Sequence, residues 1–197
     1  MNAFIAMQNY IVKEEKDFGL GVSVTLDENI AKYESCRKKN VMSLNNWMLI
    51  DIPSSETFLD LNLPLIEQKA VLPVLQKKEF ITNIFYHEAK KLLDEMGNML
   101  HGRNVKEESN KLFEEFTKEK FEFLMKFQNG QKLFDFVKSK CITKDKAKTS
   151  ALLYNSGISG FIFNNETGKR FFLYNAKKDI KPLEYRNMQL EKSKLVL

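Results

Sequence analysis

Histidine and cysteine are scarce in this sequence, which has two of each among its 197 residues. Two histidines, His87 and His101, are too few for a histidine-rich metal site. Cys36 and Cys141 lie far apart in the chain and belong to no metal-ligand spacing. We therefore expect no metal centre. We interpret the cysteines as reduced thiols of a reducing compartment, with a disulfide as the open alternative.

Several other signals are missing. No apolar run approaches the roughly 20 residues that cross a membrane, and residues 1–17 lack the basic region and small-residue cleavage site of a signal peptide. These absences predict a cytoplasmic protein without a membrane span. The sequence has no GxxxxGK[ST] loop and no GxSxG elbow, and Gly19-Leu20-Gly21 lacks the third glycine of a dinucleotide fingerprint.

Hydrophobic residues make up 43% of the sequence and charged residues 29%, which is typical of a folded domain rather than a disordered chain. The net charge of +5 is concentrated towards the C-terminal third. Such a surface suits an acidic protein or a nucleic acid, and a solvated lysine-rich surface is the alternative. The candidate partner-binding residues are Lys144, Lys146, Lys148 and Arg170.

Residues 1–63 have the pattern of strands with one helix. Asp27 is a favourable N-cap for a helix over Glu28–Arg37, which has acidic residues in its first turn. Strands are predicted over Phe4–Val12, Leu20–Leu26 and Trp47–Ile52.

Residues 64–136 have helical periodicity. We expect a short helix over Leu65–Leu75, interrupted by Pro73, and longer helices over Phe80–Leu100 and Val105–Phe127. His101 beside a glycine is interpreted as a C-terminal cap. The last helix carries an apolar stripe, which we interpret as core, with a partner-docking face as the alternative; it consists of Leu112, Phe116, Phe123 and Phe127.

The next segment predicts a helix over Lys146–Asn155, closed by Gly157 in a left-handed conformation. A β-hairpin of Ser159–Phe163 and Arg170–Asn175 should follow. Its aromatic residues are interpreted as core, with base stacking as the alternative; they are Phe161, Phe163, Phe171 and Phe172.

Strands at both ends of the chain and helices between them predict an α+β fold with a mostly antiparallel sheet built from the N- and C-terminal thirds. We expect one domain over residues 1–185, with a helical insertion at about 64–136. Residues 186–197 are predicted to form a polar tail.

The segment Phe18–Tyr33 contains a phenylalanine, two glycines around one residue, an aliphatic strand, and a helix with Ala31 and Tyr33. It resembles the nicotinamide-binding strand and helix of ADP-ribosyltransferases of the poly-ADP-ribose polymerase type. The resemblance implies an ADP-ribosyltransferase-like fold with NAD as a cofactor. The implied cofactor-binding residues are Gly19, Gly21, Ser23 and Tyr33.

Further segments extend the resemblance, in the right order, to about two-thirds of the chain. They are similar to ADP-ribosyltransferase-like domains of large phage and mobile-element proteins. The segments are Ile50-Asp51-Ile52-Pro53, Leu63-Pro64-Leu65-Ile66-Glu67-Gln68, and parts of residues 151–181.

The sequence departs from this family at each signature residue. No histidine occurs in residues 1–17, the family's strand tyrosine falls on Ser23, and its catalytic glutamate falls on Arg170. A guanidinium has the wrong charge to stabilise a cation-like transition state. The acids that could replace the glutamate are Asp135, Glu166 and Glu28.

Two functional hypotheses follow. The first is a catalytically degenerate module of phage or mobile-element type that binds a macromolecular partner, for example to inhibit a host defence protein. The alternative is an NAD-dependent ADP-ribosyltransferase that modifies a protein target. A chance similarity would leave an α+β domain of another role.

Overall fold

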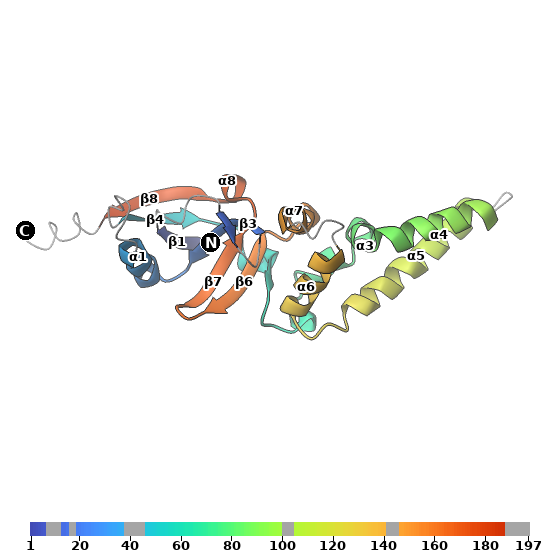
Figure 1. Cartoon of the computed structure of the whole chain (residues 1–197), viewed down its shortest axis with the longest axis horizontal. Helices are drawn as coiled ribbons and strands as arrows, with labels where there is room; N and C mark the ends of the chain where they lie inside the picture. The colour runs from blue at the N-terminus through green and yellow to red at the C-terminus, as the bar shows by residue number, and fades with distance from the viewer. Residues whose placement is uncertain (7–12, 16–18, 38–45, 100–104, 141–145, 188–197) are drawn as a thin grey trace, which may run out of the picture.

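In the computed structural model the molecule is elongated, with a β-sheet at one end and a group of helices at the other (Figure 1). The structure describes residues 1–6, 13–15, 19–37, 46–99, 105–140 and 146–187. The strands in this part of the chain are β1 (Asn2–Ala6), β2 (Lys13–Glu15), β3 (Gly19–Thr25), β4 (Asn46–Asp51), β5 (Phe58–Asp60), β6 (Gly160–Asn165), β7 (Gly168–Leu173) and β8 (Lys181–Asn187).

The helices fall into one group that covers the sheet and another that extends away from it (Figure 1). They are α1 (Glu28–Arg37), α2 (Leu72–Leu75), α3 (Lys78–Ile84), α4 (Tyr86–Met99), α5 (Val105–Leu124), α6 (Gly130–Lys140), α7 (Lys146–Ser156) and α8 (Ala176–Asp179). Short 3₁₀ turns, η2 (Ser55–Thr57) and η3 (Leu65–Glu67), flank β5.

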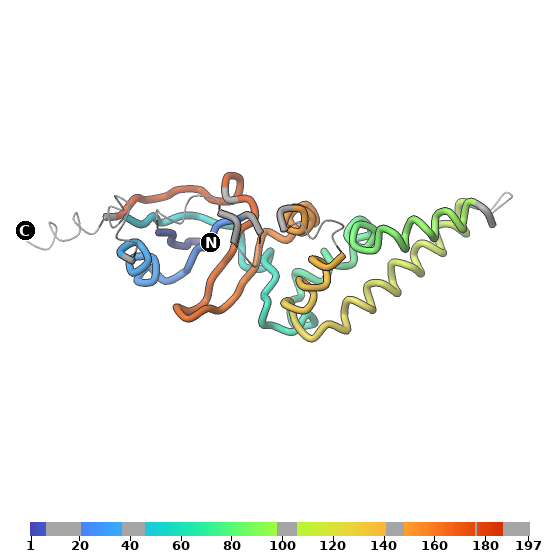
Figure 2. The backbone as a smooth tube through the Cα atoms, viewed as in Figure 1, coloured from blue at the N-terminus to red at the C-terminus, as the bar shows by residue number. Residues whose placement is uncertain are grey.

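The sheet has the strand order β5-β6-β7-β3-β1-β4-β8, and β2 pairs with β3 outside this path. Figure 2 shows that segments from both ends of the chain lie within this sheet. Val22 of β3 pairs with Leu173 of β7, and Trp47 of β4 pairs with Arg186 of β8. This confirms the predicted α+β class and the sheet shared by the two terminal thirds. The pairing of β5 with β6 is parallel, which the sequence did not predict.

Successive side chains of each strand point to opposite faces of the sheet, and the sheet therefore has an apolar layer on each face. Val22 and Val24 of β3 point to one face, where they pack with Phe171 of β7. On the other face Phe161 and Phe172 pack against helices α2, α3, α6 and α7. Phe161, Phe171 and Phe172 are buried, which confirms their interpretation as core.

Local sequence signals account for several elements. Asp27 caps α1 by accepting a hydrogen bond from the Asn29 amide at 2.8 Å, and the helix has the predicted bounds. Gly157 ends α7 with a φ of 109°. The predicted hairpin forms as β6 and β7, with a turn tighter than expected, because Asn165 pairs directly with Gly168, whose φ is 116°.

The single helix predicted over Phe80–Leu100 is wrong. It breaks at Phe85, whose ψ of 36° ends α3 before α4 begins. No glycine or proline marks this break. It lets α3 bury Phe80, Ile81 and Ile84 in the core while α4 runs out beside α5, so tertiary packing decides it.

Other boundaries also differ. The predicted helix over Leu65–Leu75 consists of η3 and the separate α2, which has Pro73 near its first turn. Of the polar tail predicted over residues 186–197, Arg186 and Asn187 continue β8 along β4, and residues 188–197 lie outside the described residues. Of the strand predicted over Phe4–Val12, residues 7–12 lie outside the described residues, as do His101 and Cys141.

The outer edge of β8 is poorly suited to pairing with a further strand. The register shifts between Leu49 and Ile50, so Leu183 has no direct partner in β4. Pro182 lacks an amide hydrogen, and Lys181, Glu184 and Arg186 place charges along the strand. Proline, bulges and charges are the usual means by which proteins prevent edge-to-edge association.

Candidate functional site

The first part of the nicotinamide site implied by the resemblance is the glycine strand, and the face of the strand that carries Gly21 and Ser23 is already filled. A Cβ atom at Gly21 would collide with the Phe172 ring and the Leu173 carbonyl oxygen. Ser23 lies on the same face, half-buried, and pairs with Phe172 across the strands. Gly19 only begins β3, and Phe18 lies outside the described residues. The strand therefore presents Phe172 rather than open backbone at this place.

The second part is Tyr33, which the structure does not bring to the glycines. Ala31 and Ser35 are buried and define the face of α1 that packs on the sheet. Tyr33 lies about 200° around the helix from Ala31 and is 58% exposed. The residues present do not fit a nicotinamide ring stacked between Tyr33 and the glycine strand.

Arg170, which the resemblance aligned with a catalytic glutamate, is only 2% exposed. Its Nη2 atom forms an ion pair with Glu34 of α1 and donates to the Thr167 hydroxyl at 3.0 Å. It therefore ties β7 to α1. The prediction that Arg170 binds a partner at the surface is not supported, because its side chain is enclosed.

The acids considered as replacements for the glutamate have other contacts. Glu28 accepts hydrogen bonds from Trp47 Nε1 at 3.0 Å and Arg186 Nη1 at 2.8 Å. Burial raises the pKa of Glu28, but these hydrogen bonds outweigh it and the net pKa is lowered. Asp135 accepts from Gln131 on α6, and Glu166 is exposed in the hairpin turn. The structure does not bring these acids together.

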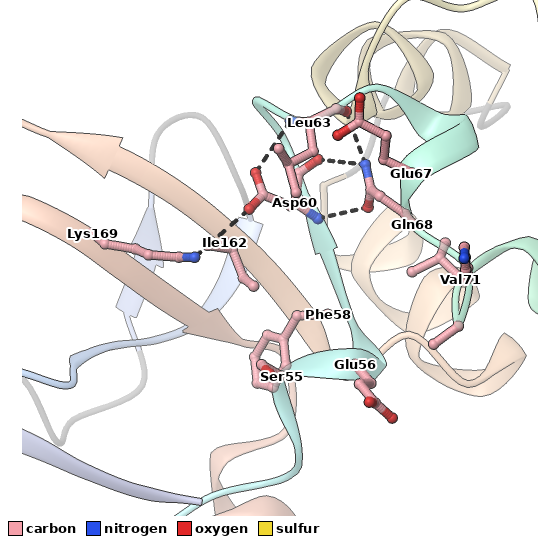
Figure 3. A pocket seen from close by; sticks show the side chains of 12 residues that line it. Ser55, Glu56, Phe58, Asp60, Leu63, Glu67, Gln68, Val71, Ile162 and Lys169 are labelled. Atoms are coloured by element: carbon pink, nitrogen blue, oxygen red, sulfur yellow. Dashed lines mark hydrogen bonds and ion pairs between the residues drawn. The ribbon is translucent and has the colours of Figure 1, made fainter.

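A cleft of about 590 Å³, which we call the edge cleft, lies beside β5 at the end of the sheet (Figure 3). It is formed by the strand itself, the turns before and after it, and the start of β7. Its lining includes Phe58, Asp60, Gln68, Val71, Ile162 and Lys169. Sequence reasoning missed this site because its residues come from two segments that lie far apart in the chain, residues 55–71 and residues 162–169.

Gln68 closes the free edge of β5. Its Oε1 accepts from the Asp60 amide at 2.9 Å, and its Nε2 donates to the carbonyls of Asp60 at 2.8 Å and Leu63 at 2.9 Å. A buried side-chain amide thus takes the place of a neighbouring strand. The one sequence signal for this role was the motif Leu63–Gln68, whose glutamine was noted only through the resemblance.

The Asp60 carboxylate is held by the backbone beyond β5. Its Oδ1 accepts from the amides of Asn62 at 2.9 Å and Leu63 at 3.3 Å. Its Oδ2 lies 3.9 Å from Lys169 Nζ, and Figure 3 shows the lysine extending towards it from β7.

A second cleft, of about 310 Å³, lies where the α3–α4 junction meets α6 and α7. We call it the helical cleft. Ile84, Phe85, Val137 and Leu152 supply its apolar lining. Lys140 and Lys148 contribute the cations, and Tyr86, His87 and Glu88 complete the polar lining.

Charges in the helical cleft are unevenly satisfied. Glu88 binds Lys120 at 2.7 Å and lies 3.8 Å from Lys140. Burial lowers the pKa of Lys120, but hydrogen bonds to Glu88 and Glu119 outweigh it and raise the net pKa. Lys148 is exposed and has no ion pair within the described residues. The lining of the helical cleft therefore carries more positive than negative charge, with Lys140 and Lys148 against Glu88.

Of the three lysines predicted to bind a partner, Lys148 lies in the helical cleft. Lys144 lies outside the described residues, and Lys146 begins α7 with its side chain also outside them. Lys140 joins Lys148 in the cleft although the sequence had not singled it out. Cys36 is exposed, and its sulfur lies 3.8 Å from the Ser35 hydroxyl oxygen.

Comparison with known proteins finds no matching family model, curated relative or similar solved structure. Over the residues that the structure describes, no helix combines the length and apolar character needed to cross a membrane. The same residues contain no group of three or more histidine, cysteine or acidic side chains arranged to hold a metal ion.

Proposed function

We propose that this protein is a module of ADP-ribosyltransferase-like fold that acts by binding an acidic protein partner instead of transferring ADP-ribose. The observation that carries the proposal is the helical cleft, in which Lys140 and Lys148 stand beside an apolar floor. The proposal agrees with the resemblance to phage and mobile-element domains, for which inhibition of a host defence protein is a fitting role.

The contacts of the signature positions support a binding role over a transfer role. Arg170 is engaged with Glu34 and Thr167 inside the fold, and Phe172 covers Gly21. Arg170 therefore stabilises the junction between α1 and the sheet, and Phe172 belongs to the buried core. A transition state with positive charge would meet a guanidinium at this position, which opposes it.

The lining of the helical cleft favours a protein segment over a nucleic acid. Its floor of Ile84, Phe85, Val137 and Leu152 suits a large aliphatic or aromatic side chain. Glu88, 3.8 Å from Lys140, would repel a phosphate and a carboxylate alike, so the apolar floor is the feature that favours a protein segment. An acidic segment with one apolar anchor satisfies both the floor and the cations.

The test uses a fluorescent helical peptide rich in glutamate with one phenylalanine, measured by anisotropy. Charge reversal of Lys140 and Lys148 to Glu should weaken binding at least about tenfold, or about 1.4 kcal/mol, because two attractive contacts become repulsive. The matched control reverses Lys111 and Lys118, exposed lysines on α5. Equal losses in the two double variants, or no loss in the first, would reject the site.

Two further measurements separate the competing functions. A DNA duplex binding more tightly than the peptide at equal salt would favour the nucleic-acid alternative. Binding of labelled NAD⁺ or release of nicotinamide by the purified protein would favour the transferase alternative. Neither signal is expected from the proposed binding module.

A further inference from the structure

We propose that the edge cleft binds a primary alkylammonium group, with Asp60 as its acceptor. This site is separate from the helical cleft and shares no residue with it. Its volume of about 590 Å³ lies within the range of about 300–1,000 Å³ common for small-ligand sites. The proposal depends on three features: a fixed carboxylate, a resident lysine and an apolar wall.

The Asp60 carboxylate is positioned before any ligand arrives. Asp60 is 8% exposed, and Gln68 holds its backbone amide and carbonyl from the open side of β5. Two backbone amides bind Oδ1, which directs Oδ2 towards the cleft and Lys169 (Figure 3). A preorganised acceptor in a partly desolvated site binds a cation more strongly than a mobile surface carboxylate does.

Lys169 shows which chemical group the cleft accepts. Its ammonium lies 3.9 Å from Asp60 Oδ2 and 6.0 Å from the centre of the Phe171 ring. A charge-assisted hydrogen bond between these groups would be about 2.7–2.9 Å long, so the resident contact is loose. The Lys169 side chain is 57% exposed. Because exposed ion pairs contribute little, it can be displaced at low cost.

The geometry favours an ammonium over a guanidinium. Oδ1 already accepts two hydrogen bonds, so Asp60 offers one oxygen and cannot form the bidentate contact that guanidinium groups prefer. Phe58, Val71 and Ile162 provide an apolar wall for the alkyl stem. The negative charges of Glu56 and Glu67 balance the positive charges of Lys69 and Lys169 in the lining. The charge of Asp60 then leaves the edge cleft with a net negative charge, which favours a cation.

The test measures binding of Nα-acetyl-lysine methylamide by chemical-shift titration of the full chain. The matched probes are its Nε-acetylated form, which lacks the charge, and the arginine analogue. We expect the lysine probe to bind at least about tenfold more tightly than the acetylated probe, as for loss of a charge-assisted hydrogen bond. The arginine probe should be weaker than the lysine probe. Equal binding of the charged and acetylated probes to the wild-type chain would overturn the proposal without any variant.

Two variants sharpen the result. Asp60→Asn keeps an oxygen for the two backbone amides but removes the charge, and it should reduce lysine-probe binding about tenfold. Lys169→Met removes the resident competitor and should increase binding several-fold. If both variants bind the lysine probe with the wild-type affinity, Asp60 is not the acceptor. Because retained affinity also shows that a variant is folded, misfolding cannot account for that result.

The source of the ammonium group is a separate question that the same titration answers. Butylamine binding as tightly as the lysine probe indicates a free amine, whereas tighter binding of a lysine-containing peptide indicates a partner polypeptide. The double reversal of Lys140 and Lys148 should leave these affinities unchanged, so failure here is distinguishable from failure of the proposed function.

Discussion

At the scale of single residues, the most informative contact is the ion pair between Arg170 and Glu34. It holds an enclosed guanidinium at the interface of β7 and α1. Removing one member of such a pair leaves a charge with poor hydration, whereas replacing both members with apolar residues is often tolerated. The pair therefore gives Arg170 a structural role that is independent of any catalytic chemistry.

We expect Glu34→Gln to lower the free energy of unfolding by about 3 kcal/mol. The double variant Glu34→Leu with Arg170→Met should recover most of this loss. Urea denaturation measures both. If the double variant is as unstable as the single one, the pair is not the cause.

Arg170→Glu would place two carboxylates together and should destabilise the fold without creating transferase activity.

Tyr174 leads to a second prediction at this scale. Within the described residues its buried hydroxyl has no hydrogen-bond partner, so Tyr174→Phe should be neutral or stabilising at pH 7. Burial raises the pKa of Tyr174 well above its ordinary value of 10.0. Above pH 10 the unfolded chain therefore loses this proton first, and the contribution of Tyr174 to stability falls by up to about 1.4 kcal/mol per pH unit until the folded pKa is reached.

Tyr174→Phe has no such proton to lose, so the melting temperature of this variant should fall less between pH 9 and pH 11 than that of the wild type. Tyr154→Phe is the comparison, because Tyr154 donates to Asp179 at 3.1 Å and its loss should cost about 1 kcal/mol at pH 7. Identical alkaline profiles for the wild type and Tyr174→Phe would contradict the prediction.

At the scale of secondary-structure elements, Glu28 joins three of them. It lies at the start of α1 and binds Trp47 of β4 and Arg186 of β8. Glu28→Gln should lower the free energy of unfolding at pH 7 by about 1–2 kcal/mol, since it removes the charge from both hydrogen bonds.

The effect should depend on pH in a defined direction. Because the folded pKa of Glu28 lies below the ordinary value of 4.5, its contribution is complete above that value and disappears as the pH falls through the folded pKa. The difference between wild type and Glu28→Gln should therefore narrow in acid. Denaturation curves at pH 7 and at progressively lower pH check this, and a constant difference would argue against it.

Elements with strong local signals were the ones that sequence predicted well. Asp27 and Gly157 define the ends of α1 and α7 through capping chemistry, and Gly168 allows the hairpin turn. Tertiary contacts decided the rest. The break at Phe85 and the three-residue strand β5 have no local marker. Similarly, Lys148 was singled out from local charge and lies in the helical cleft, whereas Asp60, Gln68 and Lys169 meet only after β5 pairs with β6.

At the scale of the whole molecule, the helical part extends from the sheet as an arm, with α4 and α5 side by side (Figure 1). A compact chain of 197 residues has a radius of gyration of about 16 Å. We expect small-angle X-ray scattering of the monomer to give a clearly larger value and an extended distance distribution. A value near 16 Å would mean that the arm folds back onto the sheet in solution.

The strand order also has a consequence for how the chain reaches this structure. Val22 pairs with Leu173 and Phe58 with Gly160, so the centre and one edge of the sheet join segments from opposite ends of the chain. Such contacts form slowly, whereas α4 and α5 can pair locally. During synthesis β3 must wait for β7, and β4 must wait for β8, before each gains its second neighbour in the sheet. A nascent chain therefore depends on protection from aggregation until its sheet can close.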